Sequence, residues 1–151
     1  ADFLAVTAEQ WDLVLGTNLR GAFLATQAFG RLAKESGRGG AVVNIASVHA
    51  GAGDGSLVPH CASKAGLLGL TRSSADALRP LGIRVNAISP GAVATWNGPW
   101  DAPPPQAPLE SMLVPSMVAD AVLWLLSDAS AGVTGSEIVV GGGTAFTLRT
   151  P

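Results

Sequence analysis

Three short runs of apolar and β-branched residues, 41–47, 83–89 and 137–140, most constrain how this chain can fold. Each run is typical of a buried strand. Patterns with helical spacing precede each of them, over residues 8–35, 59–78 and 115–128. Helices and strands that alternate in this way predict a parallel α/β sheet with helices on its faces.

Local signals support these boundaries. Thr7 and Gln10 have the spacing of a capping box, which predicts a helix beginning at Ala8. The glycine-rich stretch 37–40 ends that helix, and Pro80 to Gly82 end the next one. Pro115 suits the first turn of the third helix.

The composition is that of one folded domain over residues 1–151. Hydrophobic residues make up 48% of the chain and charged residues only 13%, which suggests apolar surface that something outside the chain covers. No basic stripe and no long apolar span are present, so we expect neither a nucleic acid nor a membrane as partner. The single cysteine, Cys61, excludes an internal disulfide and favours a cytoplasmic location. We expect no metal site.

Polar residues follow the predicted strands, where parallel sheets bind ligands. Ser47 closes the first strand, and Pro90 and Gly91 follow the second. His60 and Lys64 lie one helical turn apart near the start of the intervening helix. These groups can therefore converge at one rim of the sheet. A long segment rich in proline, glycine and alanine, 92–115, follows the second strand and is typical of a lid or binding loop.

This order and spacing resemble the short-chain dehydrogenase/reductase family. The resemblance covers essentially the whole chain, in the ordered segments 17–23, 43–47, 62–66, 83–91, 125–128, 133–135 and 142–143. It implies the C-terminal part of a Rossmann-like, doubly wound parallel sheet with about three strands and three main helices, truncated on its N-terminal side. It also implies hydride transfer between NAD or NADP and a carbonyl or alcohol substrate.

The resemblance assigns roles by position. Ser47 would hold the substrate oxygen, Lys64 would bind the nicotinamide ribose, and Asn18 would help to hold a water for proton relay. Four residues would line the nicotinamide side: Pro90, Gly91, Val93 and Thr95. Residues 94–114 would form the substrate lid, with Trp96 and Trp100 as apolar contacts. Outside this pattern each residue has a plainer explanation, such as a backbone partner for Ser47 and a solvated helix position for Lys64.

The first departure from the family is at its catalytic tyrosine. The chain contains no tyrosine, and His60 occupies that position, thirteen residues after Ser47 and four before Lys64. An ammonium favours a phenolate but disfavours an imidazolium. Lys64 is therefore expected to keep His60 neutral near pH 7. A neutral imidazole can still exchange one proton, although its ring is shorter than a phenol.

The second departure is the cofactor-binding front. The family binds its dinucleotide on a glycine-rich turn between a strand and a helix, and no such unit occurs in this sequence. We therefore expect the chain alone to bind NAD or NADP very weakly. The strand 41–47 should have an unpaired edge. The Asn18 and His60 helices, which form the family's dimer interface, predict a homo-oligomer.

Three functions remain open at this point. The chain is part of an NAD(P)-dependent oxidoreductase, inactive or severely impaired by itself, whose front half is missing from the sequence given. Alternatively, it is a non-catalytic remnant that acts as a dimerisation or regulatory module. The third alternative is a binding protein that uses the lid and Ser47 without redox chemistry. His49 is expected to be a loop residue without a role.

Overall fold

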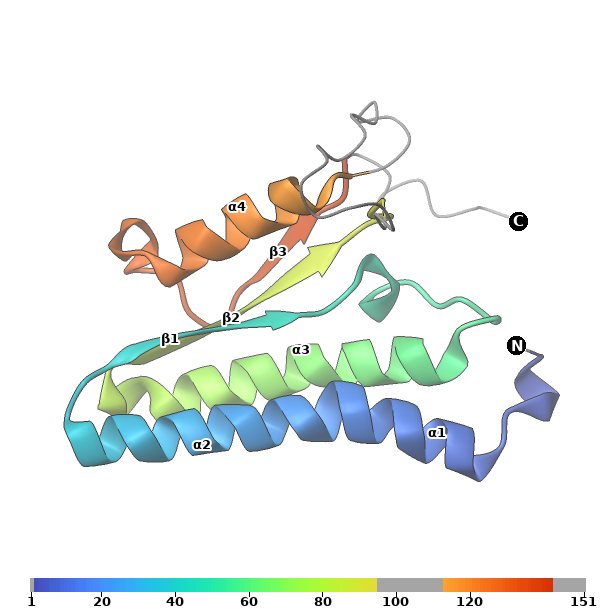
Figure 1. The fold of residues 1–151 in the computed structure, drawn as a ribbon, viewed down its shortest axis with the longest axis horizontal. Helices are drawn as coiled ribbons and strands as arrows, with labels where there is room; N and C mark the ends of the chain where they lie inside the picture. Colours follow the sequence, from blue (N-terminus) through green and yellow to red (C-terminus); the bar gives the residue numbers. More distant parts are fainter. Residues whose placement is uncertain (1, 95–112, 143–151) are drawn as a thin grey trace, which may run out of the picture.

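A computed structural model describes residues 2–94 and 113–142 (Figure 1). Its main elements are the helices α1 (Ala8–Leu15), α2 (Gly21–Ser36), α3 (Val58–Leu78) and α4 (Pro115–Leu126), and the strands β1 (Gly40–Ile45), β2 (Ile83–Pro90) and β3 (Glu137–Val140). The strands form one parallel sheet in the order β1-β2-β3. The predicted α/β class and the three strands are confirmed.

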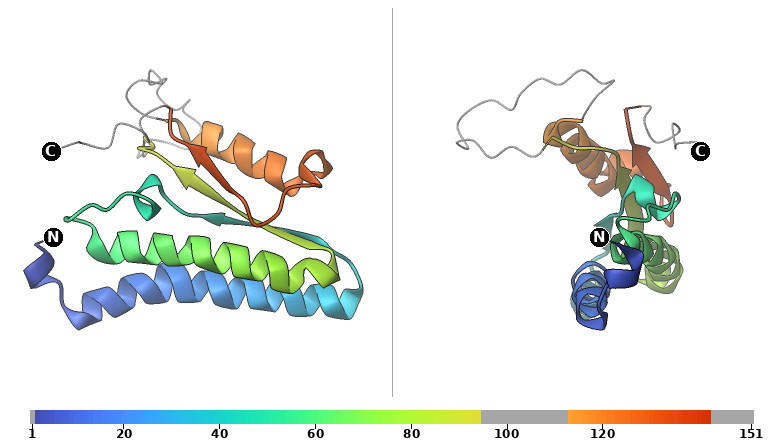
Figure 2. Two further views of the ribbon diagram at one scale, coloured as in Figure 1. Left: turned by 180° about the vertical axis from the view of Figure 1, so that it is seen from behind. Right: turned by 90° about the vertical axis from the view of Figure 1, so that its right-hand side faces the viewer.

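Helices cover both faces of the sheet. The side view in Figure 2 shows α1, α2 and α3 on one face and α4 on the other. α3 packs directly against β2, and α2 lies beside α3 and reaches β1 only near its own C-terminal end. α4 packs against β1 and β2 from the opposite side. This is the doubly wound, Rossmann-like arrangement expected from the sequence.

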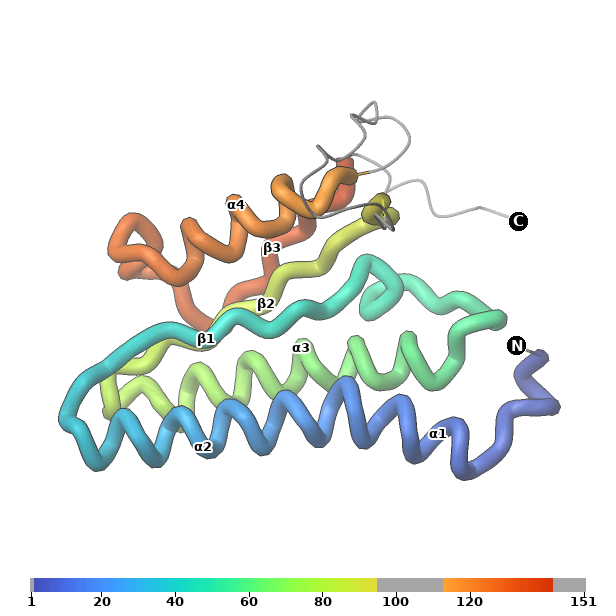
Figure 3. The backbone as a smooth tube through the Cα atoms, in the orientation of Figure 1, coloured from blue at the N-terminus to red at the C-terminus, as the bar shows by residue number. Residues whose placement is uncertain are grey.

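The first helix differs from its prediction. The pattern over 8–35 indicated one continuous α-helix, but a π-helical turn, Gly16–Arg20, separates α1 from α2 and leaves a slight bend in the backbone (Figure 3). The predicted capping box is present, because Thr7 and Gln10 each bind the other's backbone N–H. Gly37 ends α2 with a φ of 68°, a left-handed conformation that glycine adopts without a Cβ penalty.

β2 is the centre of the core. Ile83, Val85, Ala87 and Ile88 on this strand are at most 2% exposed. The start of the β1–β2 pairing requires a very close backbone approach, because a Cβ at Gly39 would collide with the carbonyl oxygen of Gly82. Gly40 N–H donates to that same oxygen at 3.1 Å.

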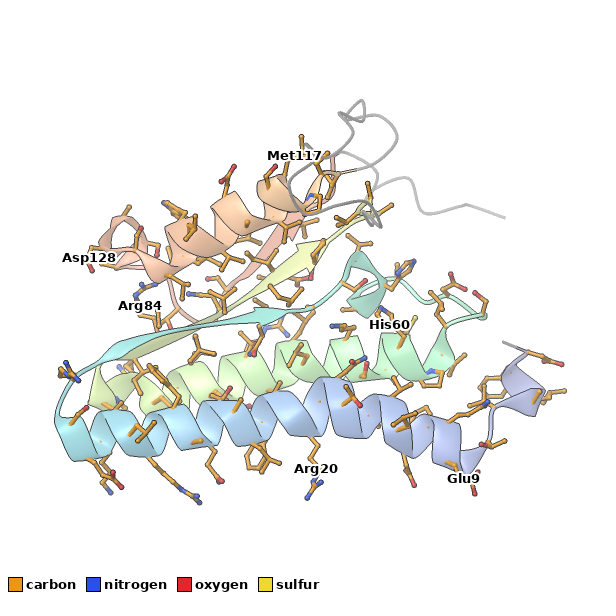
Figure 4. The ribbon with its side chains drawn as sticks, in the orientation of Figure 1. Glu9, Arg20, His60, Arg84, Met117 and Asp128 are labelled. Atoms are coloured by element: carbon orange, nitrogen blue, oxygen red, sulfur yellow. The ribbon has the colours of Figure 1, made fainter. Side chains whose placement is uncertain are left out.

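Two polar residues of β2 fix the segment between α4 and β3. Asn86 is fully buried; its Nδ2 donates to the Val133 carbonyl at 2.8 Å, and its Oδ1 accepts from the N–H of Ser136. Arg84 points from β2 toward the C-terminal end of α4 (Figure 4), where it donates to the carbonyls of Leu125 and Ser127 at 2.9 and 3.1 Å. These bonds satisfy carbonyls that a helix end leaves without partners.

The outer edge of β1 is unpaired in the part of the chain that the structure describes. β1 bonds to β2 along one side, and it is the outermost strand in the sheet order. Ile45 on this strand is 42% exposed. The predicted open edge is therefore confirmed for these residues. Over residues 2–94 and 113–142, no helix is both long and apolar enough to cross a membrane.

Candidate functional site

Ser47 lies just beyond the carboxyl end of β1. It caps a short 3-10 turn, Val48–Ala50, where its Oγ accepts the backbone N–H of His49 at 3.2 Å. The strand predicted over 41–47 thus ends two residues earlier, at Ile45, and Ser47 begins a turn instead. This turn packs against α3, so the Ser47 hydroxyl is held near the start of that helix.

His60 lies in the first turn of α3, which begins at Val58 with Pro59 in its first turn. Proline suits this place because its fixed φ and missing N–H cost nothing at a helix start. The His60 imidazole lies edge-on to the ring of His49, with 6.2 Å between the ring centroids. Figure 4 shows His60 directly below the 48–50 turn. The structure therefore brings Ser47 and His60 to the same rim, connected by His49.

Lys64 is one helical turn beyond His60. Its Nζ donates to the carbonyl oxygen of Ile45 at 2.6 Å, which fastens α3 to the last residue of β1. A charge-assisted bond of this kind is short and about twice as strong as a neutral one. Because an ammonium has three donors, two N–H groups of Lys64 remain for other partners.

The electrostatic surroundings make His60 a neutral residue near pH 7. Burial lowers the pKa of His60 most, and electrostatic interactions with Lys64 and His49 lower it further. Burial also lowers the pKa of the Lys64 ammonium. The predicted direction for His60 is thus confirmed, although desolvation and not Lys64 is the largest cause.

A Lys64→Met change should raise the pKa of His60, because it removes a nearby positive charge while keeping a long apolar side chain. The pKa should stay below that of a free histidine, since the burial that contributes most to lowering it remains. An NMR titration of the imidazole resonances measures this. Arg20→Met is a matched control, because Arg20 points away from α3 (Figure 4) and should leave the His60 titration unchanged. An unchanged His60 titration in Lys64→Met would contradict the prediction.

Asn18 lies in the π-helical turn and positions the start of α3. Its Nδ2 donates to Oγ of Ser63 at 3.0 Å, and Ser63 in turn donates to the carbonyl of His60 at 2.7 Å. Ser63 is fully buried and was missing from the sequence-based set. Gly66 lets the two helices come close, because a Cβ there would lie 2.8 Å from Leu19. Asn18 is therefore connected to the His60 backbone through one hydroxyl.

The second rim follows β2. Pro90 is the last residue of that strand, and the N–H of Gly91 donates to the Val140 carbonyl of β3 at 2.9 Å. Val93 forms a bridge with Leu113, so the two ends of the intervening segment lie together. Thr95, Trp96 and Trp100 lie outside the described residues, as does most of the expected lid.

His49 and Asp54, like Ser63, are residues that the sequence reasoning missed. Nδ1 of His49 lies 3.4 Å from Oγ of Ser47, and its Nε2 lies 4.0 Å from Oδ2 of Asp54. The only signal in the sequence was the place of His49 two residues after a polar strand end. Within the described ranges, no group of three histidine, cysteine or acidic side chains could hold a metal ion.

Comparison with known proteins identifies the family of this chain. A family model described as enoyl-(acyl carrier protein) reductase matches residues 1–145. The chain is 37% identical to L-rhamnose 1-dehydrogenase (NAD(P)(+)) of Azotobacter vinelandii over 97% of its own length. The chain therefore belongs to the short-chain dehydrogenase/reductase family, as its motifs predicted.

Solved structures show the same fold. Acetoin dehydrogenase from Salmonella typhimurium superposes with a TM-score of 0.90 and 32% identity, over all of this chain and 61% of that one. A 4-hydroxyisoleucine dehydrogenase complexed with NADH and succinate gives 0.80 and 28%, over 95% of this chain and 63% of that one. The chain spans 60% of the length of the rhamnose dehydrogenase.

Proposed function

We propose that this chain is the substrate-side part of an NAD(P)-dependent oxidoreductase that transfers hydride between a carbonyl and an alcohol, and that the 151 residues alone are inactive or severely impaired. The observation that carries this proposal is the rim beyond β1. Three side chains come together there, those of Ser47, His60 and Lys64. Ser47 follows the end of β1, the other two belong to α3, and Nζ of Lys64 donates to the Ile45 carbonyl oxygen at 2.6 Å. Relatives named as dehydrogenases support the same chemistry.

The residues present suit the nicotinamide side of such a cofactor. Lys64 has donors left for ribose hydroxyls, and Pro90, Gly91 and Val93 form the neighbouring wall after β2. In the described residues, the loop 46–57 between β1 and α3 contains Gly51, Gly53 and Gly55. These glycines lack the G-x-G-x-x-G spacing of a turn that cradles a pyrophosphate. When bound, NAD(P) would supply or accept the hydride. Its binding by the chain alone is expected to be very weak.

The chain's own residues would handle the substrate oxygen. The Ser47 hydroxyl would donate a hydrogen bond to it, and His60 would take the proton from an alcohol as a neutral base. The imidazolium that forms would be disfavoured by burial and by Lys64, the same causes that lower the pKa of His60. Proton transfer to His60 is therefore disfavoured. The same ammonium would stabilise the phenolate form of a tyrosine at this position.

The experiment joins the chain to the part of the A. vinelandii rhamnose dehydrogenase that it does not cover; we call this the joined protein. Titration with NADH, followed by nicotinamide fluorescence, should show binding in the joined protein and none tighter than millimolar in the chain alone. Slow NAD(P)-dependent oxidation of small alcohols is expected in the joined protein. Tight binding by the chain alone, or no hydride transfer by the joined protein even with excess enzyme, would contradict the proposal.

A second candidate is a non-catalytic dimerisation or regulatory module. Exposed apolar side chains favour it: on α1 and α2 these are Trp11, Leu13, Phe23, Leu24 and Leu32. Such a surface indicates a protein partner. We propose that it pairs with a second copy through the helices of Asn18 and His60, in either candidate function.

A further inference from the structure

The Ser47 hydroxyl has more neighbours than a simple substrate anchor needs. One of its lone pairs already accepts the His49 backbone N–H at 3.2 Å. Its oxygen also faces Nδ1 of the same residue at 3.4 Å, the long end of hydrogen-bond range. A serine hydroxyl has a single proton to donate. Whether that proton points at the His49 ring or away from it depends on the state of Nδ1.

Asp54 controls that state from the other side of the ring. Its Oδ1 accepts both the N–H and the hydroxyl of Ser56, at 2.8 and 2.7 Å, which fixes the carboxylate. Oδ2 is left facing Nε2 of His49 at 4.0 Å. These bonds from Ser56 also lower the pKa of Asp54, so it stays ionised near neutral pH. A carboxylate beside Nε2 favours a proton on that nitrogen, and in a neutral ring Nδ1 then becomes the acceptor.

We propose that His49 is a positioning residue, held by Asp54, that decides whether the Ser47 hydroxyl donates its proton to the imidazole or to a ligand oxygen. In the neutral ring, Nδ1 accepts the Ser47 proton, so the hydroxyl is turned inward. In the protonated ring, Nδ1–H donates to Oγ, and the hydroxyl proton is released toward the rim. The ligand would carry an acceptor oxygen such as a carbonyl. This last step rests on the proposed function.

The charged groups around His49 are consistent with this role. Asp54 comes from the 51–57 loop, while His60 and Lys64 come from α3. β2 also packs against the turn, but its one charged residue, Arg84, is bound at the far end of α4. An imidazole beside a carboxylate takes up a proton in preference to one beside an ammonium. The Asp54 carboxylate therefore acts on the His49 side of this pair of rings, and the Lys64 ammonium acts on the His60 side.

The test measures the tautomer of the neutral His49 ring in the 151-residue chain. It is read from the NMR chemical shifts of the two ring nitrogens at a pH where the ring is neutral. The wild-type ring should carry its proton on Nε2. Asp54→Asn should shift the population toward Nδ1–H, and Asp54→Glu should restore most of the Nε2–H form. Asp128→Asn is the matched control, because Asp128 lies at the opposite end of the molecule from His60 (Figure 4) and its loss should change nothing. If Asp54 had only a structural role, Asp54→Asn would leave the populations of the two His49 tautomers unchanged.

Ser47→Ala supplies the second measurement. It should shift the Nδ1 resonance toward that of a free imine nitrogen, because the hydroxyl no longer donates to it. Two results would overturn the proposal. One is a wild-type His49 ring that carries its proton on Nδ1, and the other is a tautomer population that Asp54→Asn does not change. Neither measurement involves cofactor or turnover. Failure here therefore differs from failure of the hydride-transfer assay.

Discussion

His60→Tyr should raise the hydride-transfer rate of the joined protein roughly 100-fold, because a phenol reaches farther than an imidazole and a misplacement of about 1 Å costs on that order. The charges act in the same direction. Lys64 and burial oppose a proton on His60, whereas the same ammonium stabilises a phenolate. The position at the start of α3, opposite the Ser47 turn, stays the same. Initial rates from nicotinamide absorbance measure the effect.

His60→Phe is the matched control for this change. It supplies an aromatic ring of similar size that carries no exchangeable proton, so its rate should not rise. If His60→Tyr gives no gain while the protein still binds NADH, then His60 is not the defect, and the non-catalytic candidate gains support. A gain in both variants would mean that packing, and not proton transfer, limits the rate.

Arg84→Ala should have the largest effect on stability, a loss of about 3 kcal/mol, because a hydrogen bond to a charged group contributes roughly 1.5–3 kcal/mol and this side chain makes several. Its guanidinium binds the carbonyls of Leu125 and Ser127 and the hydroxyl of Ser130. Without it, the C-terminal end of α4 and the turn into β3 lose their common partner. Urea denaturation followed by circular dichroism measures the change.

Two further variants make the Arg84 test specific. Arg84→Lys keeps the charge but lacks the forked donors, so an intermediate loss is expected. Arg72 is exposed on α3, and Arg72→Ala should change the free energy of unfolding by less than about 0.5 kcal/mol. Equal losses for Arg72→Ala and Arg84→Ala would show that the bonds at the end of α4 contribute nothing.

Much of the fold could be predicted because its signals are local. The strand at 137–140 and the starts of α1 and β2 follow from runs and capping residues that need no tertiary information. The order of elements then predicts a parallel sheet, since parallel neighbours need long crossovers and the predicted helices supply them. The positions of Ser47, His60 and Lys64 at one rim follow from that topology.

The remaining features depend on contacts between distant residues. The π-helical turn at Gly16–Arg20 accompanies the packing of Leu19 against Gly66, and helical periodicity alone does not report such packing. His49 gave no pattern, because its importance comes from the cap that Ser47 forms and from the rotation of its ring toward Asp54. Neighbours in space that lie in an irregular loop are the hardest part of a site to find from sequence.

The pairing of β1 with β2 has a consequence for synthesis of the protein. Gly40 pairs with Ile83, so a ribosome completes β1 well before its neighbour emerges. At about 5–20 residues per second, the nascent strand waits for several seconds without its β2 partner. Parallel sheets fold slowly for this reason. Helices α1 and α2 are already complete by then and can shield β1, and a chaperone that binds apolar strands would find its target in this interval.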